Sequence, residues 1–228
     1  MPEAVRLLLI ETSGKTGQVA VADGAGVLDS RRLEESRRHA RDLAPAVREL
    51  LLAQGWQARD LNAVAVSRGP GSYTGLRVGL MSAQALAYAT GCAVLALDTF
   101  AVIARQSPPE ASSVIVIADA QQERVYAQRF QRTRDDWEAA DALRIEPIAA
   151  LLGQRQPADW LTGPGLALHA AKLPTGTPVV AAPQREARLD SMLALAVARL
   201  AQGQRDDLWR LEPLYARPSS AEEQWDRR

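Results

Sequence analysis

Short aliphatic runs and longer helical patterns alternate along the whole chain. Val5–Ile10 is an aliphatic run of the kind that forms a strand buried on both faces. Returning strands are expected at Gln18–Ala22 and Val27–Leu33, and Asp23-Gly24 between them is a hairpin signal. The elements expected next are a helix over Arg38–Ala53, a strand over Leu61–Val66, a helix over Leu76–Thr90, a strand over Ala93–Leu97 and a helix over Thr99–Gln106. The order of this first portion is therefore β-β-β-α-β-α-β-α.

A similar order recurs after the polar, proline-paired segment Ser107–Glu110, which is the best candidate for a domain boundary. Strands are expected there over Ser113–Ala118, Arg124–Gln131, Ala142–Ile145, Trp160–Thr162 and Pro178–Ala181, and helices over Pro147–Leu152 and Arg185–Gln202. The repetition predicts an α/β protein of the actin-like or Hsp70-like (ASKHA) architecture, with two ribonuclease-H-like lobes at residues 1–107 and 108–228. The pattern does not assign the last helix to either lobe.

The segment from Ser67 to Gly79 carries four glycines where a predicted strand passes into a predicted helix. A glycine-rich turn at a helix start presents backbone N–H groups beside the positive end of the helix dipole. The sequence leaves two interpretations open: an anion site formed by Gly69, Gly71, Ser72 and Thr74, or glycines that serve packing alone. The segment is not a Walker A loop, because no lysine follows its glycines.

The helix after this loop carries a stripe of small residues. Gly75, Gly79, Ala83 and Ala87 recur every four positions and therefore share one side of the helix. This stripe either packs against the protein's own sheet or lets a partner's helix approach closely. Under the second interpretation the interface also draws on the preceding helix.

Groups that could perform catalysis are sparse. Glu11 and Asp119 end equivalent strands of the two halves, either as ligands for a metal–nucleotide or as solvated strand ends. His39 and His169 are far apart in sequence, and Cys92 has no histidine near it in sequence. A transition-metal site needs several such ligands at close spacing, and a cysteine nucleophile needs a base. We therefore expect no catalytic residues, no metal and no cofactor.

Composition narrows the class of protein further. Lys plus Arg and Asp plus Glu are both 27, so the formal net charge is zero, which disfavours strong RNA binding without a partner. The hydrophobic content of 47% supports real cores, and a lone cysteine favours a reducing compartment. The chain has no apolar run long enough to cross a bilayer. These features predict a cytoplasmic protein without a membrane partner.

Four segments resemble the TsaB (YeaZ) family of bacterial tRNA threonylcarbamoyladenosine biosynthesis proteins. They are Leu8–Thr12, Arg68–Ala89, Ile117–Tyr126 and Glu212–Arg217. The resemblance implies a non-catalytic subunit that pairs with the transferase TsaD through the two helices of the N-terminal lobe. The interface residues that it implies are Gly75, Gly79, Leu80, Met81, Ala83, Leu86, Ala87 and Tyr88 on the second helix, and His39, Leu43, Val47 and Leu50 on the first. It also implies that TsaE and tRNA join the complex, and that homodimers use a similar surface when TsaD is absent. TsaD carries metal-binding histidines after the next strand, whereas Leu95–Ile103 contains none.

A second function remains open on the residues alone. The glycine loop and the strand-end acids are also compatible with a stand-alone nucleotide- or metal-dependent enzyme, such as a kinase or a metallopeptidase. The absence of a Walker lysine and of a histidine pair from the sequence counts against that alternative. The resemblance favours the scaffold subunit.

Overall fold

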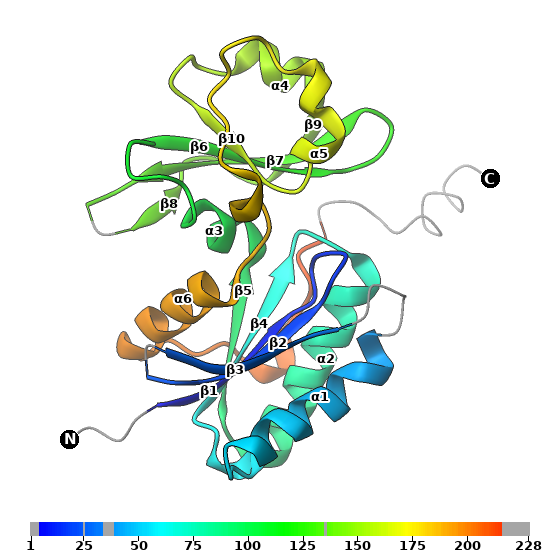
Figure 1. The fold of residues 1–228 in the computed structure, drawn as a ribbon, viewed down its shortest axis with the longest axis vertical. Helices are drawn as coiled ribbons and strands as arrows, with labels where there is room; N and C mark the ends of the chain where they lie inside the picture. Colours follow the sequence, from blue (N-terminus) through cyan, green and yellow to red (C-terminus); the bar gives the residue numbers. More distant parts are fainter. Residues whose placement is uncertain (1–4, 25, 34–38, 135, 216–228) are drawn as a thin grey trace. The chain divides into compact units, whose positions relative to one another are not determined.

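The computed structural model describes residues 5–24, 26–33, 39–134 and 136–215. The chain divides into two compact units (Figure 1). Unit 1 contains the chain up to Thr99 together with Ala187–Leu214, and unit 2 contains Phe100–Glu186. The division therefore differs from the predicted lobes 1–107 and 108–228, because the chain returns to unit 1 after Glu186.

Unit 1 is built on one five-stranded sheet in the order β3-β2-β1-β4-β5. The strands are β1 (Arg6–Glu11), β2 (Gln18–Asp23), β3 (Gly26–Arg32), β4 (Ala63–Gly69) and β5 (Ala93–Asp98). Strands β1, β2 and β3 pair antiparallel, whereas β1, β4 and β5 run parallel. The aliphatic runs of β1 and β4 follow from this position, because central strands are covered on both faces.

Helices cover the two faces of this sheet. Helices α1 (His39–Ala53) and α2 (Tyr73–Thr90) lie on one face, and the short turn η1 (Ala58–Asp60) links α1 to β4 (Figure 1). Their apolar side chains form one core with Leu8, Ile10 and Val66. Helix α6 (Leu189–Ala201) covers the opposite face and contacts all five strands. The last long helix therefore belongs to unit 1.

Unit 2 contains a second five-stranded sheet, with path β10-β6-β7-β8 and with β9 paired to β7. Its core lies between Ile115, Ile117 and the helices α4 and α5. The elements are α3 (Thr99–Ala104, beginning at the last residue of unit 1), β6 (Ser113–Asp119), β7 (Arg124–Arg132), β8 (Trp137–Ala139), β9 (Arg144–Pro147), α4 (Ile148–Gln154), β10 (Trp160–Thr162), α5 (Leu166–His169), and the turns η2 (Ala170–Lys172) and η3 (Ala182–Gln184).

Two predictions for unit 2 are corrected by the structure. The segment predicted as a strand at Pro178–Ala181 makes only an isolated bridge between Val179 and Leu161. Proline has no N–H to donate to a sheet, so Pro178 contributes its carbonyl alone, which accepts from the Leu161 N–H at 2.9 Å. In addition, β8 forms where the pattern predicted no strand, and it pairs with the end of β7.

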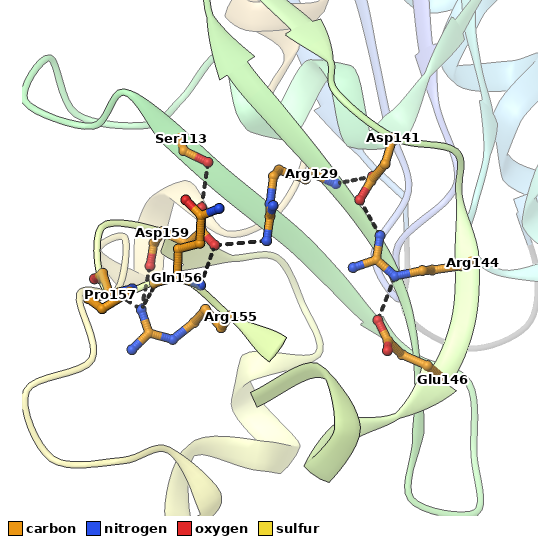
Figure 2. Close-up of polar contacts among 9 residues, drawn as sticks. All are labelled: Ser113, Arg129, Asp141, Arg144, Glu146, Arg155, Gln156, Pro157 and Asp159. Atoms are coloured by element: carbon orange, nitrogen blue, oxygen red, sulfur yellow. Dashed lines mark hydrogen bonds and ion pairs between the residues drawn. The ribbon is translucent and has the colours of Figure 1, made fainter. Parts of the chain in front are cut away.

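Unit 2 is tied together by a buried carboxylate (Figure 2). The Asp159 side chain is 1% exposed and accepts hydrogen bonds from Ser113 Oγ at 2.6 Å, Arg129 Nη2 at 2.9 Å and Gln156 N at 2.9 Å. These donors come from β6, from β7 and from the loop that enters β10. A buried charge is stable only with such a set of partners, so Asp159 fixes three segments at once.

Candidate functional site on the helix after the glycine loop

The backbone N–H groups of the glycine loop make hydrogen bonds within unit 1, both inside the loop and to the turn after β1. Ser72 is the N-cap of α2, with its Oγ accepting the Gly75 N–H at 3.2 Å. The Ser72 N–H donates to the Ser13 carbonyl at 2.7 Å, and the Leu76 N–H donates to the Ser72 carbonyl at 2.8 Å. These three N–H groups therefore bind protein acceptors, as a capped helix start requires.

Close approach to the turn after β1 explains two of the glycines. A Cβ at Gly71 would lie 2.5 Å from the Ser13 carbonyl oxygen, and one at Gly75 would lie 2.0 Å from that of Thr12. Real side chains do not tolerate such distances to backbone. The geometry supports the packing interpretation of these glycines, and anion binding by Gly69, Gly71, Ser72 and Thr74 stays a prediction.

The small-residue stripe of α2 faces the protein's own sheet. A Cβ at Gly79 would lie 2.3 Å from Thr12 Oγ1 and 3.3 Å from Val66 Cγ2. Because the stripe is small, α2 lies close against β1 and β4. The predicted interface is thereby corrected at the positions that are buried within unit 1: Gly75, Gly79, Leu80, Ala83 and Ala87 on α2, and Leu43 and Leu50 on α1.

The opposite side of α2 exposes apolar side chains. Met81 is 67% exposed and Tyr88 is 71% exposed, with the exposed Ala85 between them. We call these three residues the outer stripe. Their spacing of four and three positions places them on one side of the helix. Large apolar side chains at this exposure and spacing are typical of a surface that another helix covers.

The remaining predicted interface residues are Leu86 on α2 and Val47 and His39 on α1. Leu86 and Val47 are partly buried and pack against the core of unit 1. His39 is the first residue of α1, and its side chain lies outside the described part of the structure. Leu52 on α1, which the sequence analysis did not select, is 63% exposed.

A segment near the C-terminus binds across unit 1, and we call Asp206–Leu214 the C-terminal strap. Asp206 covers the edge strand β5, because its N–H donates to the Val94 carbonyl at 3.0 Å and its Oδ2 accepts the Ala96 N–H at 2.7 Å. The strap then passes through the short turn η4 (Leu208–Arg210) and reaches the glycine loop. There the Leu214 N–H donates to the Arg68 carbonyl at 2.7 Å.

The strap lines a polar pocket of about 360 Å³ beside Arg68 that is open to solvent. Arg68 Nε donates to Asp98 Oδ1 at 2.5 Å, and this hydrogen bond raises the pKa of Arg68, which stays charged. The pocket wall carries both signs of charge. It consists of Arg68, Asp206, Asp207, Arg210, Leu211, Glu212, Pro213 and Leu214.

The two strand-end acids lie in different environments. Glu11 is 3% exposed, and its Oε1 accepts from the Ser13 N–H at 2.6 Å and the Ser13 hydroxyl at 2.5 Å. Asp119 is 38% exposed, accepts the Gln121 N–H at 3.1 Å and lies 3.9 Å from His169 Nε2. Glu11 therefore fixes the turn after β1, whereas Asp119 remains accessible to solvent. Among the described residues, no three histidine, cysteine or acidic side chains converge as metal ligands do.

Cys92 is half-buried just before β5. Burial raises the pKa of its thiol, because the charged thiolate is poorly solvated there. A raised pKa lowers the thiolate fraction near neutral pH, and the thiolate is the reactive form.

Comparison with known proteins identifies the family. The family model for TsaD, tRNA N6-adenosine threonylcarbamoyltransferase, matches residues 32–197. The chain is 29% identical over 163 residues to the tRNA threonylcarbamoyladenosine biosynthesis protein TsaB of Escherichia coli, which covers 69% of this chain and 70% of that protein. YeaZ from Pseudomonas aeruginosa superimposes with a TM-score of 0.80 at 27% identity, covering 92% of this chain and 99% of YeaZ. The chain belongs to the TsaB (YeaZ) family.

Membership of the TsaB family confirms the predicted actin-like α/β fold. A shorter likeness connects the chain to TsaD-type enzymes. The chain is 43% identical over 63 residues to the tRNA N6-adenosine threonylcarbamoyltransferase of Solidesulfovibrio magneticus. This match covers 28% of the chain and 17% of the enzyme. No helix in the described residues is both long enough and apolar enough to cross a bilayer.

The contacts of the strap were not predicted from the sequence, although the family resemblance included Glu212–Arg217, which overlaps its end. Gln84 on α2 binds the strap by donating to the Leu208 carbonyl at 3.0 Å and to the Leu211 carbonyl at 3.4 Å. Leu208 and Leu211 also pack against the core of unit 1. Their spacing of three, with polar residues around them, was the one signal that a short amphipathic turn was present.

Proposed function

We propose that this chain is a non-catalytic scaffold subunit that binds a TsaD-type transferase. In the complex it supports transfer of the threonylcarbamoyl group to the tRNA adenosine 3′ of the anticodon, which forms N6-threonylcarbamoyladenosine. TsaE and tRNA join the assembled complex in the cytoplasm. The proposal is supported by the TsaB family, whose members are named for threonylcarbamoyladenosine biosynthesis.

The outer stripe of α2 is the observation that carries the proposal. One side of α2 is fully used in the core of unit 1, while Met81, Ala85 and Tyr88 stand in solvent on the other side. A helix of a second protein can cover this spacing by side-chain packing. Tyrosine and methionine suit such a surface, because one is a rigid anchor and the other adapts its shape.

The family model supports a TsaD-type protein as the partner. The TsaD model matches residues 32–197, a range that includes both α1 and α2. A TsaD-type chain therefore carries a related helix pair that can pack against this one. Binding raises transferase activity if the scaffold binds the active conformation of TsaD more tightly than the inactive one.

A complex-formation assay tests this function. A tagged TsaD-type protein from the same genome is co-purified with the wild-type chain and with the double variant Met81→Glu, Tyr88→Glu, and modification of tRNA is measured in a reconstituted system. We expect the double variant to lose both co-purification and support of modification. The matched control is Leu168→Glu, since Leu168 is 66% exposed on α5 in unit 2. Full modification without this chain would contradict the proposal.

The competing function, a stand-alone kinase or metallopeptidase, has one observation in its favour. Asp119 is solvent-accessible at the end of β6, where a carboxylate can bind a metal–nucleotide. Titration calorimetry with ATP and Mg²⁺ on the isolated chain tests it. Under the scaffold proposal no binding is expected. Tight binding or turnover that Asp119→Asn removes would establish the competing function instead.

A further inference from the structure

Two aromatic rings stand together in solvent at the C-terminal end of the outer stripe. Trp209 is 78% exposed and Tyr88 is 71% exposed. Their ring centroids lie 5.7 Å apart with an interplanar angle of 70°, an edge-to-face contact. A tryptophan exposes a large apolar area, so such a pair on a free surface is typical of an interaction site.

The strap holds Trp209 in a fixed position. Its neighbours Leu208 and Leu211 pack inward against the core of unit 1, and Gln84 donates to the carbonyls of both. Asp207 Oδ1 accepts the Trp209 N–H at 2.9 Å and so caps η4. The backbone on both sides of the indole is therefore anchored while the ring itself points outward. A ring that is already ordered loses little entropy when a partner covers it.

We infer that Trp209 and Tyr88 form an aromatic anchor that extends the docking surface of α2 onto the strap. The occupant is a helix of the TsaD-type partner, so this inference rests on the proposed function. The anchor is continuous with the outer stripe through Tyr88, which belongs to both. A helix that covers Met81 and Ala85 and continues along α2 therefore reaches Trp209 as well.

By this inference the strap has two roles: it covers the edge strand β5, and it contributes Trp209 to the binding surface. The same segment that closes the edge strand also carries part of the binding surface. Tryptophan is among the residues that dominate binding energy at protein interfaces. The strap thereby makes partner binding depend on a contact between two segments far apart in sequence, Gln84 and the Leu208–Leu211 backbone.

Affinity measurements with two neighbouring variants test the inference. The dissociation constant of the complex is measured for wild type, Trp209→Ala and Arg210→Ala. Trp209→Ala is expected to weaken binding about tenfold or more, as loss of an interface anchor does. Arg210, which is 87% exposed on the same turn, is the matched control, and its loss is expected to change affinity by less than about twofold. Chemical denaturation of Trp209→Ala checks that the free chain keeps its stability.

A spectroscopic measurement observes the indole directly. The chain is labelled with 5-fluorotryptophan in a Trp225→Phe background, and Trp209→Phe assigns the Trp209 resonance in the ¹⁹F spectrum. Adding the unlabelled TsaD-type partner is expected to shift this resonance and to remove its response to exchange of H₂O for D₂O. The resonances of Trp56 and Trp137, which are buried in the free chain, are expected to stay unchanged.

The outcomes separate this inference from the proposed function. If the outer-stripe variant loses the partner while Trp209→Ala and the ¹⁹F resonance of Trp209 show no effect, the inference fails and the function stands. If no complex forms with the wild-type chain, both fail. If Trp209 is covered by a second copy of this chain and stays so when the partner is added, the assigned occupant is wrong.

Discussion

The two sides of helix α2 differ in the size and the exposure of their residues. The inner side carries glycine and alanine at every fourth position, and a single added methyl at Gly75 or Gly79 would collide with Thr12. The outer side carries Met81 and Tyr88, which are mostly exposed. Both sides have helical spacing, yet only the inner one is required by the fold. The difference teaches that helical spacing alone does not say what a side of the helix does: the small residues pack the fold, and we propose that the large ones bind a partner.

The largest expected effect is a loss of stability caused by a substitution on the inner side of α2. Gly75→Ala places a Cβ 2.0 Å from the Thr12 carbonyl oxygen, so backbone must move, and we expect a stability loss of about 3 kcal/mol. The matched control is Gly153→Ala in α4, where nothing lies within 4 Å of the added Cβ. That variant is expected to be neutral or more stable by up to about 1 kcal/mol. Urea denaturation of both variants measures the contrast, and equal stabilities would show that α2 does not pack tightly on β1.

A smaller effect is expected where the strap meets α2. Gln84→Ala removes two hydrogen bonds to strap carbonyls, which should cost about 1 kcal/mol of stability. Hydrogen exchange of the strap backbone is expected to rise more than that of β1 or β4, because those strands do not depend on the hydrogen bonds that Gln84 makes. Unchanged hydrogen exchange at residues 206–214 would show that the strap is held in place without the two hydrogen bonds from Gln84.

On the outer side we expect almost no change in stability. Tyr88→Ala removes an exposed ring, and its stability is expected to stay within about 0.5 kcal/mol of wild type. The measurement is again urea denaturation, performed beside the Gly75 variant. A loss as large as that of Gly75→Ala would mean that Tyr88 supports the fold, and the separation of the two sides would disappear.

The smallest effect concerns Cys92, which lies between the end of α2 and the start of β5. Burial raises the pKa of its thiol, so at pH 8 a smaller share is thiolate than in an unfolded peptide. We expect slow reaction with a thiol reagent at pH 8, faster reaction as the pH rises further, and fast reaction after denaturation. Equal rates in the folded and denatured chain at pH 8 would contradict this.

The sequence was sufficient for the strands and long helices of unit 1, but not for which side of α2 faces the sheet. Periodicity predicted the strands of unit 1 and the stripe Gly75, Gly79, Ala83 and Ala87, and all four residues share one side of α2. Periodicity is the same whether that side faces a sheet or a partner. The contact with Thr12, distant in sequence, decides the matter, and no local pattern contains it.

Long-range contacts also explain the other differences between the predictions from sequence and the structure. The strap binds through Gln84 and Arg68, which are far from it in sequence, so its role follows only from the fold. In unit 2, β8 is short, and its pairing with β7 is visible only in three dimensions. Helix α6 belongs to unit 1 because its apolar side packs on the face of that sheet which α1 and α2 leave uncovered. The spacing of apolar residues in α6 cannot predict which sheet it covers.

The affinity of the chain for its TsaD-type partner, measured by titration calorimetry, tests the central claim most directly. Wild type is compared with Met81→Glu, Tyr88→Glu, after urea denaturation has shown that the two are equally stable. The account predicts that the double variant binds about a hundredfold more weakly or not at all, because two charges would be buried at the interface. An unchanged dissociation constant at equal stability would contradict the assignment of the outer stripe as the docking surface.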